Sequence, residues 1–214
     1  MRIETRPVGP FQANCHLVVD DATGRAVLID PGANDDAVLD MIRQARATLE
    51  AIWLTHAHID HIGGVSEVRR HFPVPVYLHP LDRPLYDSLS GQMAEAYGIP
   101  FEQPDPPDRE LAEGDLLACG GLRFTVMHVP GHAPGLVSFN ADGIAISGDL
   151  LFAGSIGRTD LPLSDPFEMD ASLERFSTLP EHTIVYPGHG EPTTIGEELL
   201  SNPFLSGRAR ALKR

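Results

Sequence analysis

A six-residue segment of the chain carries four side chains that can bind metal ions. It reads His56-Ala57-His58-Ile59-Asp60-His61, which is the spacing H-x-H-x-D-H, and Ile62-Gly63-Gly64 follows it. Imidazole nitrogens and carboxylate oxygens are ligands for zinc, iron and manganese. Four such groups in one short loop can hold more than one ion, and two adjacent ions suggest hydrolysis. The segment therefore predicts a metal-dependent chemistry.

Three later segments each run from an apolar stretch into a glycine-containing turn that carries His or Asp. The turns are Pro130-Gly131-His132, Gly148-Asp149 and Pro187-Gly188-His189. Glycine beside a ligand permits close approaches of the backbone that other residues resist. Strand ends that each present one ligand can converge on one rim of a pair of sheets, so we expect these three side chains near the first segment.

Short apolar stretches bounded by Gly, Pro, Asp or Asn predict the strands that must position these turns. The expected strands are Ile3–Val8, Cys15–Val19, Ala26–Ile29, Ala51–Leu54, Val74–Leu78, Arg123–Val129, Gly135–Phe139, Gly143–Ile146 and Thr183–Tyr186. A 3.6-residue apolar period predicts helices, namely Asp35–Ala47, Gly63–Phe72 and Phe167–Leu179, with a fourth starting near Thr194. Strands come first and then alternate with helices in two loosely similar halves. This order indicates two sheets packed on each other with helices outside.

The least regular part of the sequence follows the predicted central strands. Leu85–Tyr97 is apolar and bears aromatic residues, and the proline-rich stretch Gly98–Asp108 reads as a surface loop. Two interpretations of Leu85–Tyr97 stay open. It can overhang a pocket, or it can be a small helical excursion that only packs on the body of the fold.

Size and charge set the broad class. A chain of 214 residues with 42% hydrophobic and 21% charged residues is expected to form one globular domain over residues 1–214. The formal net charge of −14 repels phosphate backbones and anionic membranes, so neither nucleic acid nor a membrane is an expected partner. A small-molecule substrate is expected, and the oligomeric state stays open.

Two further features indicate a cytoplasmic protein. The first residues lack the apolar stretch of a secretory signal, and no apolar run approaches the roughly 20 residues of a membrane span. Cys15 and Cys119 lie far apart and form no C-x-x-C motif, so a disulfide framework is not expected. Both are interpreted as small, buried apolar side chains.

The four ligand-bearing segments, in this order, resemble the metallo-β-lactamase superfamily. The resemblance runs from the turn Ile29-Asp30-Pro31-Gly32 to His189. Within the superfamily the chain is most similar to the glyoxalase II-like branch, the hydroxyacylglutathione hydrolases. Residues 155–160, 193–198 and Asn202-Pro203-Phe204 carry that similarity. It implies an α+β fold, a four-layer αββα sandwich with the metal site at one rim of the two sheets.

The resemblance also implies two divalent metal ions per chain, with zinc expected first and iron or manganese as alternatives. Carried over by position, the ligands are His56, His58 and His132 for one ion, Asp60, His61 and His189 for the other, and Asp149 as a bridge between both. The two carboxylates offset part of the +4 charge, and open positions remain for water and substrate.

The implied reaction is hydrolysis of a thioester, such as a hydroxyacylglutathione, by a hydroxide that bridges the two ions. Asp60 and Asp149 are the expected catalytic residues. Asp149 shares the ions, and Asp60 can also hold the proton of the hydroxide. Positive charge at the centre stabilises the tetrahedral oxyanion, so no Ser or Cys nucleophile is needed.

Arg158 is the expected substrate contact. It lies nine residues after Asp149 in a glycine-containing loop, and a guanidinium can bind a carboxylate through two hydrogen bonds. An internal ion pair with Asp160 or Asp165 is the alternative role.

Glyoxalase II enzymes carry a C-terminal helical extension that contacts glutathione, and we expect no separate domain of that kind here. Four basic residues stand in the last seven positions, Arg208, Arg210, Lys213 and Arg214. Two interpretations stay open: a solvated tail, which is favoured, or residues that approximate the basic contacts to glutathione. A thiol ester other than one of glutathione therefore stays open as the substrate.

Rival functions also stay open. A mono-iron persulfide dioxygenase of the same fold resembles the chain at residues 157–160, but Leu161-Pro162 replaces the Phe-Gln of that branch. A metal-binding protein without catalysis is the other rival. β-Lactam hydrolysis is less favoured because Cys119 is not placed as a metal ligand, and the charge of −14 argues against a nuclease.

Overall fold

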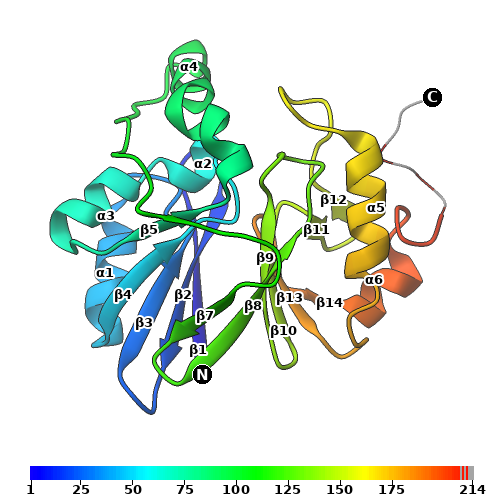
Figure 1. The fold of residues 1–214 in the computed structure, drawn as a ribbon, viewed down its shortest axis with the longest axis horizontal. Helices are drawn as coiled ribbons and strands as arrows, with labels where there is room; N and C mark the ends of the chain where they lie inside the picture. Colours follow the sequence, from blue (N-terminus) through cyan, green and yellow to red (C-terminus); the bar gives the residue numbers. More distant parts are fainter. Residues whose placement is uncertain (208, 210, 212–214) are drawn as a thin grey trace.

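The computed structural model describes residues 1–207, 209 and 211, so the basic residues Arg208, Arg210, Lys213 and Arg214 lie outside the described part. Two β-sheets pack on each other in the middle of the molecule (Figure 1). Helices α1 and α3 cover the outer face of one sheet, and helices α5 and α6 cover the outer face of the other (Figure 1). This is the four-layer αββα sandwich of the α+β class, so the expected fold is confirmed.

The N-terminal half forms the first sheet, whose six strands follow the order β1-β2-β3-β4-β5-β6. The strands are β1 (Arg2–Val8), β2 (Ala13–Asp20), β3 (Arg25–Ile29), β4 (Thr48–Trp53), β5 (Val76–Leu78) and β6 (Arg109–Glu110). The first three are antiparallel, whereas β3, β4, β5 and β6 run parallel. Helix α1 (Asp36–Ala45) connects β3 to β4. Helices α2 (Ile59–Ile62) and α3 (Val65–His71) lie between β4 and β5.

The C-terminal half forms the second sheet, in the order β14-β13-β10-β9-β8-β7. The strands are β7 (Leu116–Cys119), β8 (Leu122–His128), β9 (Val137–Ala141), β10 (Ile144–Gly148), β13 (Ile184–Pro187) and β14 (Thr193–Thr194). Only β10 and β13 pair in parallel, and α5 (Pro166–Phe176) lies between them in the chain. A small hairpin of β11 (Leu151–Phe152) and β12 (Ser155–Ile156) follows β10, and α6 (Ile195–Ser201) follows β14.

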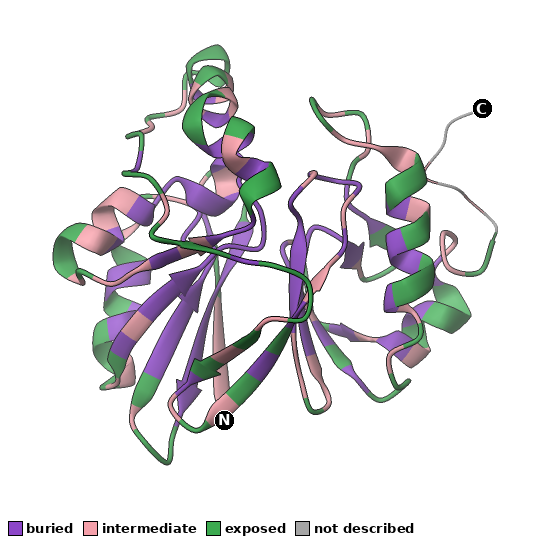
Figure 2. Cartoon of the chain, in the orientation of Figure 1, coloured by how far each residue is buried: buried purple, intermediate pink, exposed green. Residues whose placement is uncertain are grey.

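The core between the sheets is aromatic. Trp53 of β4 packs against Phe124 of β8 and Phe139 of β9, with ring centroids 5.5 and 5.3 Å apart. All three side chains are buried, and strands β2, β3 and β4 of the first sheet are buried over most of their length (Figure 2). Burying such large rings stabilises the sandwich by roughly 2–3 kcal/mol for each side chain. Cys15 and Cys119 are buried free thiols, as expected.

Local sequence signals explain where the outer helices begin. The side chain of Asp35 accepts a hydrogen bond from the backbone N–H of Ala37 and caps α1. Asp165 caps α5 in the same way, and Pro166 occupies the first helical position, where a missing N–H costs nothing. Each helix buries its predicted apolar stripe against a sheet.

The structure adds short elements that the sequence patterns did not indicate. Strands β6, β11, β12 and β14 have two residues each, too few for an alternating pattern to be visible. Leu85–Tyr97 is helical, with a π-helical turn at Leu85–Leu89 that continues into α4 (Ser90–Tyr97). Figure 1 shows α4 at the end of the molecule where the ligand-bearing turns lie.

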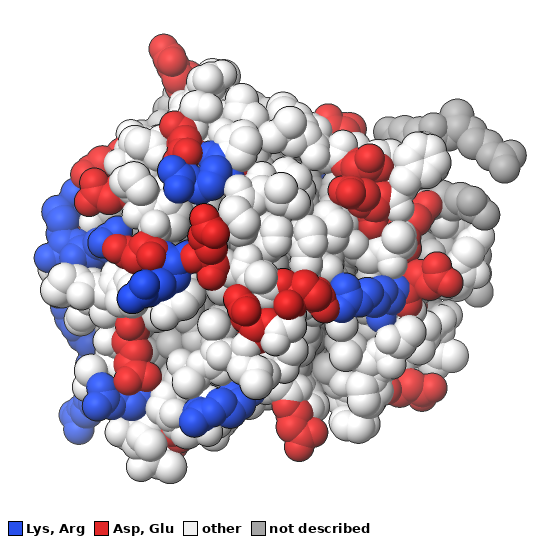
Figure 3. Space-filling view, viewed as in Figure 1, with Lys and Arg blue, Asp and Glu red and all other residues white. Residues whose placement is uncertain are grey.

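Charges of both signs are interspersed on the face in Figure 3. Several exposed arginines of the molecule lie in ion pairs, among them Arg70 with Glu102 and Arg175 with Glu113. No helix in the described part of the chain is long and apolar enough to cross a membrane.

Candidate metal centre

The candidate ligands lie together at one rim of the two sheets. His56 comes three residues after β4, Asp149 directly follows β10, and His189 comes two residues after β13. Strand β4 is parallel to β3, and β10 is parallel to β13. Because the carboxyl ends of parallel strands meet at the same edge of a sheet, the turns after them converge. His132 joins them from the loop after β8.

His56, His58 and His132 form the first ligand group. One nitrogen of each ring lies within 4.8 Å of those of the other two, and all three residues are buried. Nδ1 of His58 is 2.8 Å from Nε2 of His132. Two imidazole nitrogens this close need a proton or a cation between them. Nδ1 of His132 lies 2.8 Å from the carbonyl oxygen of Arg158, so this nitrogen donates and Nε2 keeps its lone pair for a ligand.

Asp60, His61 and His189 form the second ligand group, again within 4.8 Å of one another. Oδ2 of Asp60 lies 3.3 Å from Nε2 of His189 and 3.9 Å from Nε2 of His61. The two groups are therefore the same sets of three that the resemblance implied.

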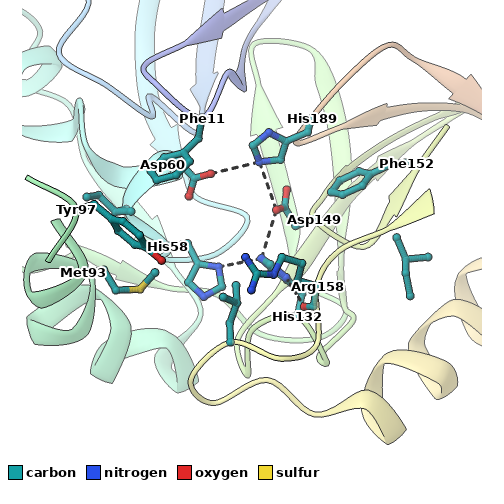
Figure 4. A pocket seen from close by; sticks show the side chains of 13 residues that line it. Phe11, His58, Asp60, Met93, Tyr97, His132, Asp149, Phe152, Arg158 and His189 are labelled. Carbon is teal, nitrogen blue, oxygen red and sulfur yellow. Dashed lines mark hydrogen bonds and ion pairs between the residues drawn. The ribbon is translucent and has the colours of Figure 1, made fainter. Parts of the chain in front are cut away.

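Asp149 lies between the two groups. Its Oδ2 is 3.3 Å from Nε2 of His132 in the first group and 3.5 Å from Nε2 of His189 in the second. Its Oδ1 is 3.4 Å from Nε2 of His61. Figure 4 shows the Asp149 carboxylate between His189 and His132. Two atoms bound at 2.0–2.1 Å to one tetrahedral ion lie about 3.4 Å apart, so these separations suit shared ions.

The residues fit a metal centre because several of their buried polar atoms have no partner. Nε2 of His56, Nε2 of His61 and Oδ1 of Asp149 are buried without a hydrogen bond. An unsatisfied buried polar group costs about 1–3 kcal/mol, and folded proteins contain few of them. Three in one cluster of imidazole and carboxylate groups indicate atoms reserved for metal ions.

Burial keeps the first group of imidazoles neutral. Burial, followed by the neighbouring His132, lowers the pKa of His58 to about 3. Burial, followed by the neighbouring His61, lowers the pKa of His56 well below its usual range. The pKa of His132 is also lowered, chiefly by burial. A neutral imidazole has the free lone pair that a metal ligand needs.

The carboxylates of the centre require positive charge beside them. Burial alone would lower the pKa of His61, but Asp149, Asp60 and Asp30 raise it well above its usual value. Burial alone would raise the pKa of Asp149, but the charge of the neighbouring His61 holds that pKa well below the usual range. Divalent cations between the two groups would meet this requirement.

Asp30 orients one ligand. Its Oδ1 accepts a hydrogen bond from the backbone N–H of Thr55 at 2.8 Å, and its Oδ2 accepts from the Thr55 hydroxyl and from Nδ1 of His61 at 2.9 Å. Asp30 also lies close enough to His56 and His61 to form a third possible ligand group. Both of its oxygens are already occupied, so we interpret Asp30 as the carboxylate that turns Nε2 of His61 towards the centre. The sequence placed Asp30 in a turn but gave it no such role, although a buried Asp directly after an apolar strand is a usable signal.

Gly188 shows why glycine stands beside a ligand. A Cβ atom at this position would lie 2.1 Å from Oδ1 of Asp149 and 2.9 Å from Cε1 of His61. No side chain fits there, so the close approach expected from the sequence is confirmed at this turn.

A cavity of about 240 Å³ opens onto the two ligand groups. Figure 4 shows its polar side, with Asp60, Asp149 and His189, and its apolar walls. The walls are Phe11, Met93, Tyr97, Phe152, Ile156 and Leu161. Met93 and Tyr97 belong to α4, so the segment that could overhang a pocket does line one.

Arg158 also borders this cavity. Its guanidinium forms the ion pair with Asp160 that was the alternative role, with Nε 2.8 Å from Oδ1 and Nη2 3.1 Å from Oδ2. Both side chains are about two-thirds exposed, so this pair contributes little to stability. The backbone carbonyl oxygen of Arg158 has a different role, because it accepts the hydrogen bond from Nδ1 of His132 that orients this ring.

Comparison with known proteins decides the family. Residues 8–189 match the family described as the metallo-beta-lactamase superfamily. The chain belongs to the metallo-β-lactamase superfamily. Enzymes of this superfamily are typically hydrolases with metal sites, and the His and Asp cluster of this chain lies where such a site is expected.

Relatives within the superfamily match over nearly their full length. GloC of Haemophilus influenzae, named a hydroxyacylglutathione hydrolase, is 39% identical over 98% of this chain and 100% of that protein. The crystal structure of TTHA1623 in a di-iron-bound form has a TM-score of 0.86 and 44% identity, over 96% of this chain and 100% of that one. BLEG-1, named a B3 metallo-beta-lactamase, has a TM-score of 0.89 and 41% identity over the same shares.

Asp82 ties together two loops of the metallo-β-lactamase site. Its fully buried carboxylate accepts a hydrogen bond from the backbone N–H of Ala57, which stands between His56 and His58, at 2.8 Å. It also accepts one from the backbone N–H of Gly135, in the loop after β8. Burial raises the pKa of Asp82 to about 7, although the two backbone donors act in the opposite direction. The sequence did not indicate this residue, because its contacts span 25 and 53 residues of chain.

The substitution Asp82→Asn is expected to loosen the first ligand group. Asparagine keeps one acceptor oxygen and replaces the other by an N–H₂ donor, which would face a backbone N–H without a partner. An unsatisfied buried donor costs about 1–3 kcal/mol, and loss of a supporting contact costs about 10-fold or more in metal affinity. Chemical denaturation and metal titration measure both effects. Asp142→Asn, in the exposed turn between β9 and β10, is the matched control and should change neither. Wild-type stability and metal affinity in Asp82→Asn would contradict this role.

Proposed function

We propose that the chain is a two-metal hydrolase that cleaves thioesters of the hydroxyacylglutathione type. The observation that carries the proposal is the Asp149 carboxylate, which lies 3.3–3.5 Å from ligand nitrogens of both groups. The name of GloC, hydroxyacylglutathione hydrolase, supports the substrate type. The di-iron form of TTHA1623 supports a centre with two metal ions.

Seven residues would hold the two ions. His56, His58 and His132 would bind the first ion, and Asp60, His61 and His189 would bind the second. Asp149 would bind both ions. Bound divalent metals polarise a carbonyl group and lower the pKa of water towards neutrality. Zinc is the ion we expect first, with iron or manganese as alternatives, because imidazole and carboxylate ligands accept all three.

Asp60 is the residue best placed to handle a proton. It lines the cavity, and Nε2 of His189 lies 3.3 Å from its Oδ2. Burial alone would raise its pKa, but the charge of His61 and the hydrogen bond from His189 lower it. An ionised Asp60 can accept a hydrogen bond from the attacking water and hold it towards the substrate carbonyl.

In the overall reaction, water oxygen bonds to the carbonyl carbon and the carbon–sulfur bond breaks. The products are a carboxylic acid and a thiol, and water supplies the proton that the leaving sulfur gains. The aromatic side chains of Phe11, Tyr97 and Phe152 line the cavity in which this reaction would take place.

A mono-iron persulfide dioxygenase remains the main rival. It would use one ion and leave the second ligand group without a metal. In this chain the second group is assembled as closely as the first, with ligand atoms within 4.8 Å. This assembly favours two ions.

Hydrolysis of S-lactoylglutathione tests the proposed function. We expect turnover by the protein as purified, loss of turnover after chelation, and recovery on addition of zinc, iron or manganese. A chromogenic cephalosporin and glutathione persulfide, followed by colour and by oxygen consumption, are the comparison substrates. Oxygen consumption with no thioester cleavage would overturn the proposal in favour of the dioxygenase. Cephalosporin cleavage with no thioester cleavage would replace it by β-lactam hydrolysis.

A further inference from the structure

A second cavity of about 200 Å³ lies beside the metal centre. It lies between the turn that follows β1, the start of the loop after β3, and the loop after α4. Its apolar lining consists of Val8, Pro10, Phe11, Ala33, Ile59, Ile99 and Pro100. Gly9, Gly32, Asn34, Asp60 and Gly63 complete the wall. Neither Lys nor Arg is among the described residues that line it.

The two cavities share part of their lining. Phe11, Ile59 and Asp60 line both of them, so a molecule with its reacting carbon beside Asp60 can extend into either one. Hydrogen bonds of a neighbouring residue anchor the segment that carries Phe11. At the start of β2, three residues after Phe11, the side chain of Asn14 donates to the carbonyl oxygens of Pro187 and Gly190 at 2.9 and 2.8 Å, on either side of His189.

Exposed aromatic rings mark the entrance. Phe11 is 42% exposed and Tyr97 of α4 is 61% exposed. Their rings meet edge to face with centroids 6.0 Å apart. Figure 4 shows both at the side of the first cavity. Large apolar side chains that stay exposed next to a cavity indicate a surface for an apolar ligand.

The second cavity offers no Lys or Arg partner to an anionic arm among the described residues that line it. Among the described residues that line the two cavities, Arg158 is the one Lys or Arg side chain, and Asp160 already pairs with it. Asp60 borders both cavities. A neutral alkyl or aryl group in the second cavity would lose water-exposed apolar area.

We infer that the cavity beside Phe11 is a subsite for a neutral, apolar arm of the substrate. This inference rests on the proposed function, and it specifies the substrate class as thioesters with an alkyl or aryl arm. The arm can belong to the acyl group or to the thiol. Each methylene that becomes fully buried should improve binding about fourfold.

Two measurements on the metal-loaded protein test the subsite. The first is titration calorimetry, which gives the dissociation constants of butanoate, hexanoate and octanoate and does not depend on turnover. The second is kcat/KM for two thioester series, one lengthened in the acyl group of N-acetylcysteamine esters and one lengthened in the thiol of acetyl esters. The series in which kcat/KM rises with length identifies the arm that occupies the cavity.

Ile99→Asp is the test variant, because Ile99 lines only the second cavity and is partly exposed. Leu200→Asp is its matched control, since Leu200 is 81% exposed on α6 and lines neither cavity. We expect octanoate to bind the wild type and the control at least 10-fold more tightly than butanoate, and Ile99→Asp to lose most of that gain. Two results would overturn the proposed subsite even if thioesters are cleaved. One is that the three acids bind the wild type equally well, and the other is that affinity rises from butanoate to octanoate as much in Ile99→Asp as in the wild type. A length-dependent gain that Ile99→Asp removes, without cleavage of any thioester, supports the subsite and rejects the proposed hydrolysis instead.

Discussion

The substitution Asp149→Ala is expected to lower both the metal content and the turnover of the protein. The carboxylate lies 3.3–3.5 Å from His61, His132 and His189, so its loss removes a ligand from each proposed ion at once. It also leaves the buried ring of His61 without the partner that raises its pKa most. Loss of a residue that only supports a ligand costs about 10–100-fold in affinity or activity. Removal of a shared ligand should therefore lower kcat/KM by at least about 100-fold.

Elemental analysis and kinetics of the same preparation measure this effect. Asp142→Ala provides the control, because Asp142 is exposed in the turn between β9 and β10. It should retain the metal content and kcat/KM of the wild type. An Asp149→Ala protein that keeps two ions per chain and full turnover would rule out the bridging role.

Asp30→Ala is expected to cost both stability and metal affinity. Its carboxylate is buried and accepts hydrogen bonds from the Thr55 backbone, the Thr55 hydroxyl and His61. Removing one member of a buried charged pair costs about 3–5 kcal/mol, because the remaining donors lose their acceptor. For a chain of this size each kcal/mol shifts Tm by about 2–4 °C. The metal-free protein should therefore melt at least about 6 °C below the wild type.

Metal affinity, measured beside the melting temperature, shows whether Asp30 orients His61 or only stabilises the fold. Asp30→Asn keeps one acceptor oxygen and should recover part of the melting temperature, while metal affinity stays about 10-fold or more below that of the wild type. Asp40→Ala, in an exposed ion pair with Arg43 on α1, is the control for loss of a carboxylate. Wild-type metal affinity in Asp30→Ala would show that Asp30 supports the fold and does not orient the ligand.

The candidate ligands could be predicted because their signals are local. His56, His58, Asp60 and His61 stand within six residues, and His132, Asp149 and His189 each stand next to a glycine at the end of an apolar stretch. Every strand that leads into one of these turns was expected within a few residues of its observed bounds. The resemblance then arranged the ligands in two groups, and the structure brings the same residues together.

The residues that position the ligands could not be predicted in the same way. Asp30 reaches Thr55 across 25 residues and His61 across 31, and Asp82 reaches Gly135 across 53. These contacts exist only after the sheets have packed, and nothing in the local sequence specifies which backbone N–H a buried Asp will meet. The apolar subsite is similar, because Phe11 and Ile99 come from loops 88 positions apart in the numbering.

The number of metal ions per chain tests the central claim most directly. The metal-free protein, titrated with zinc and then freed of loosely bound ions, should retain two ions per chain by elemental analysis. The Asp149→Ala protein, treated in parallel, should retain fewer. A wild-type protein that binds one ion per chain at saturation, with the second ligand group left without a metal, would contradict the two-metal account.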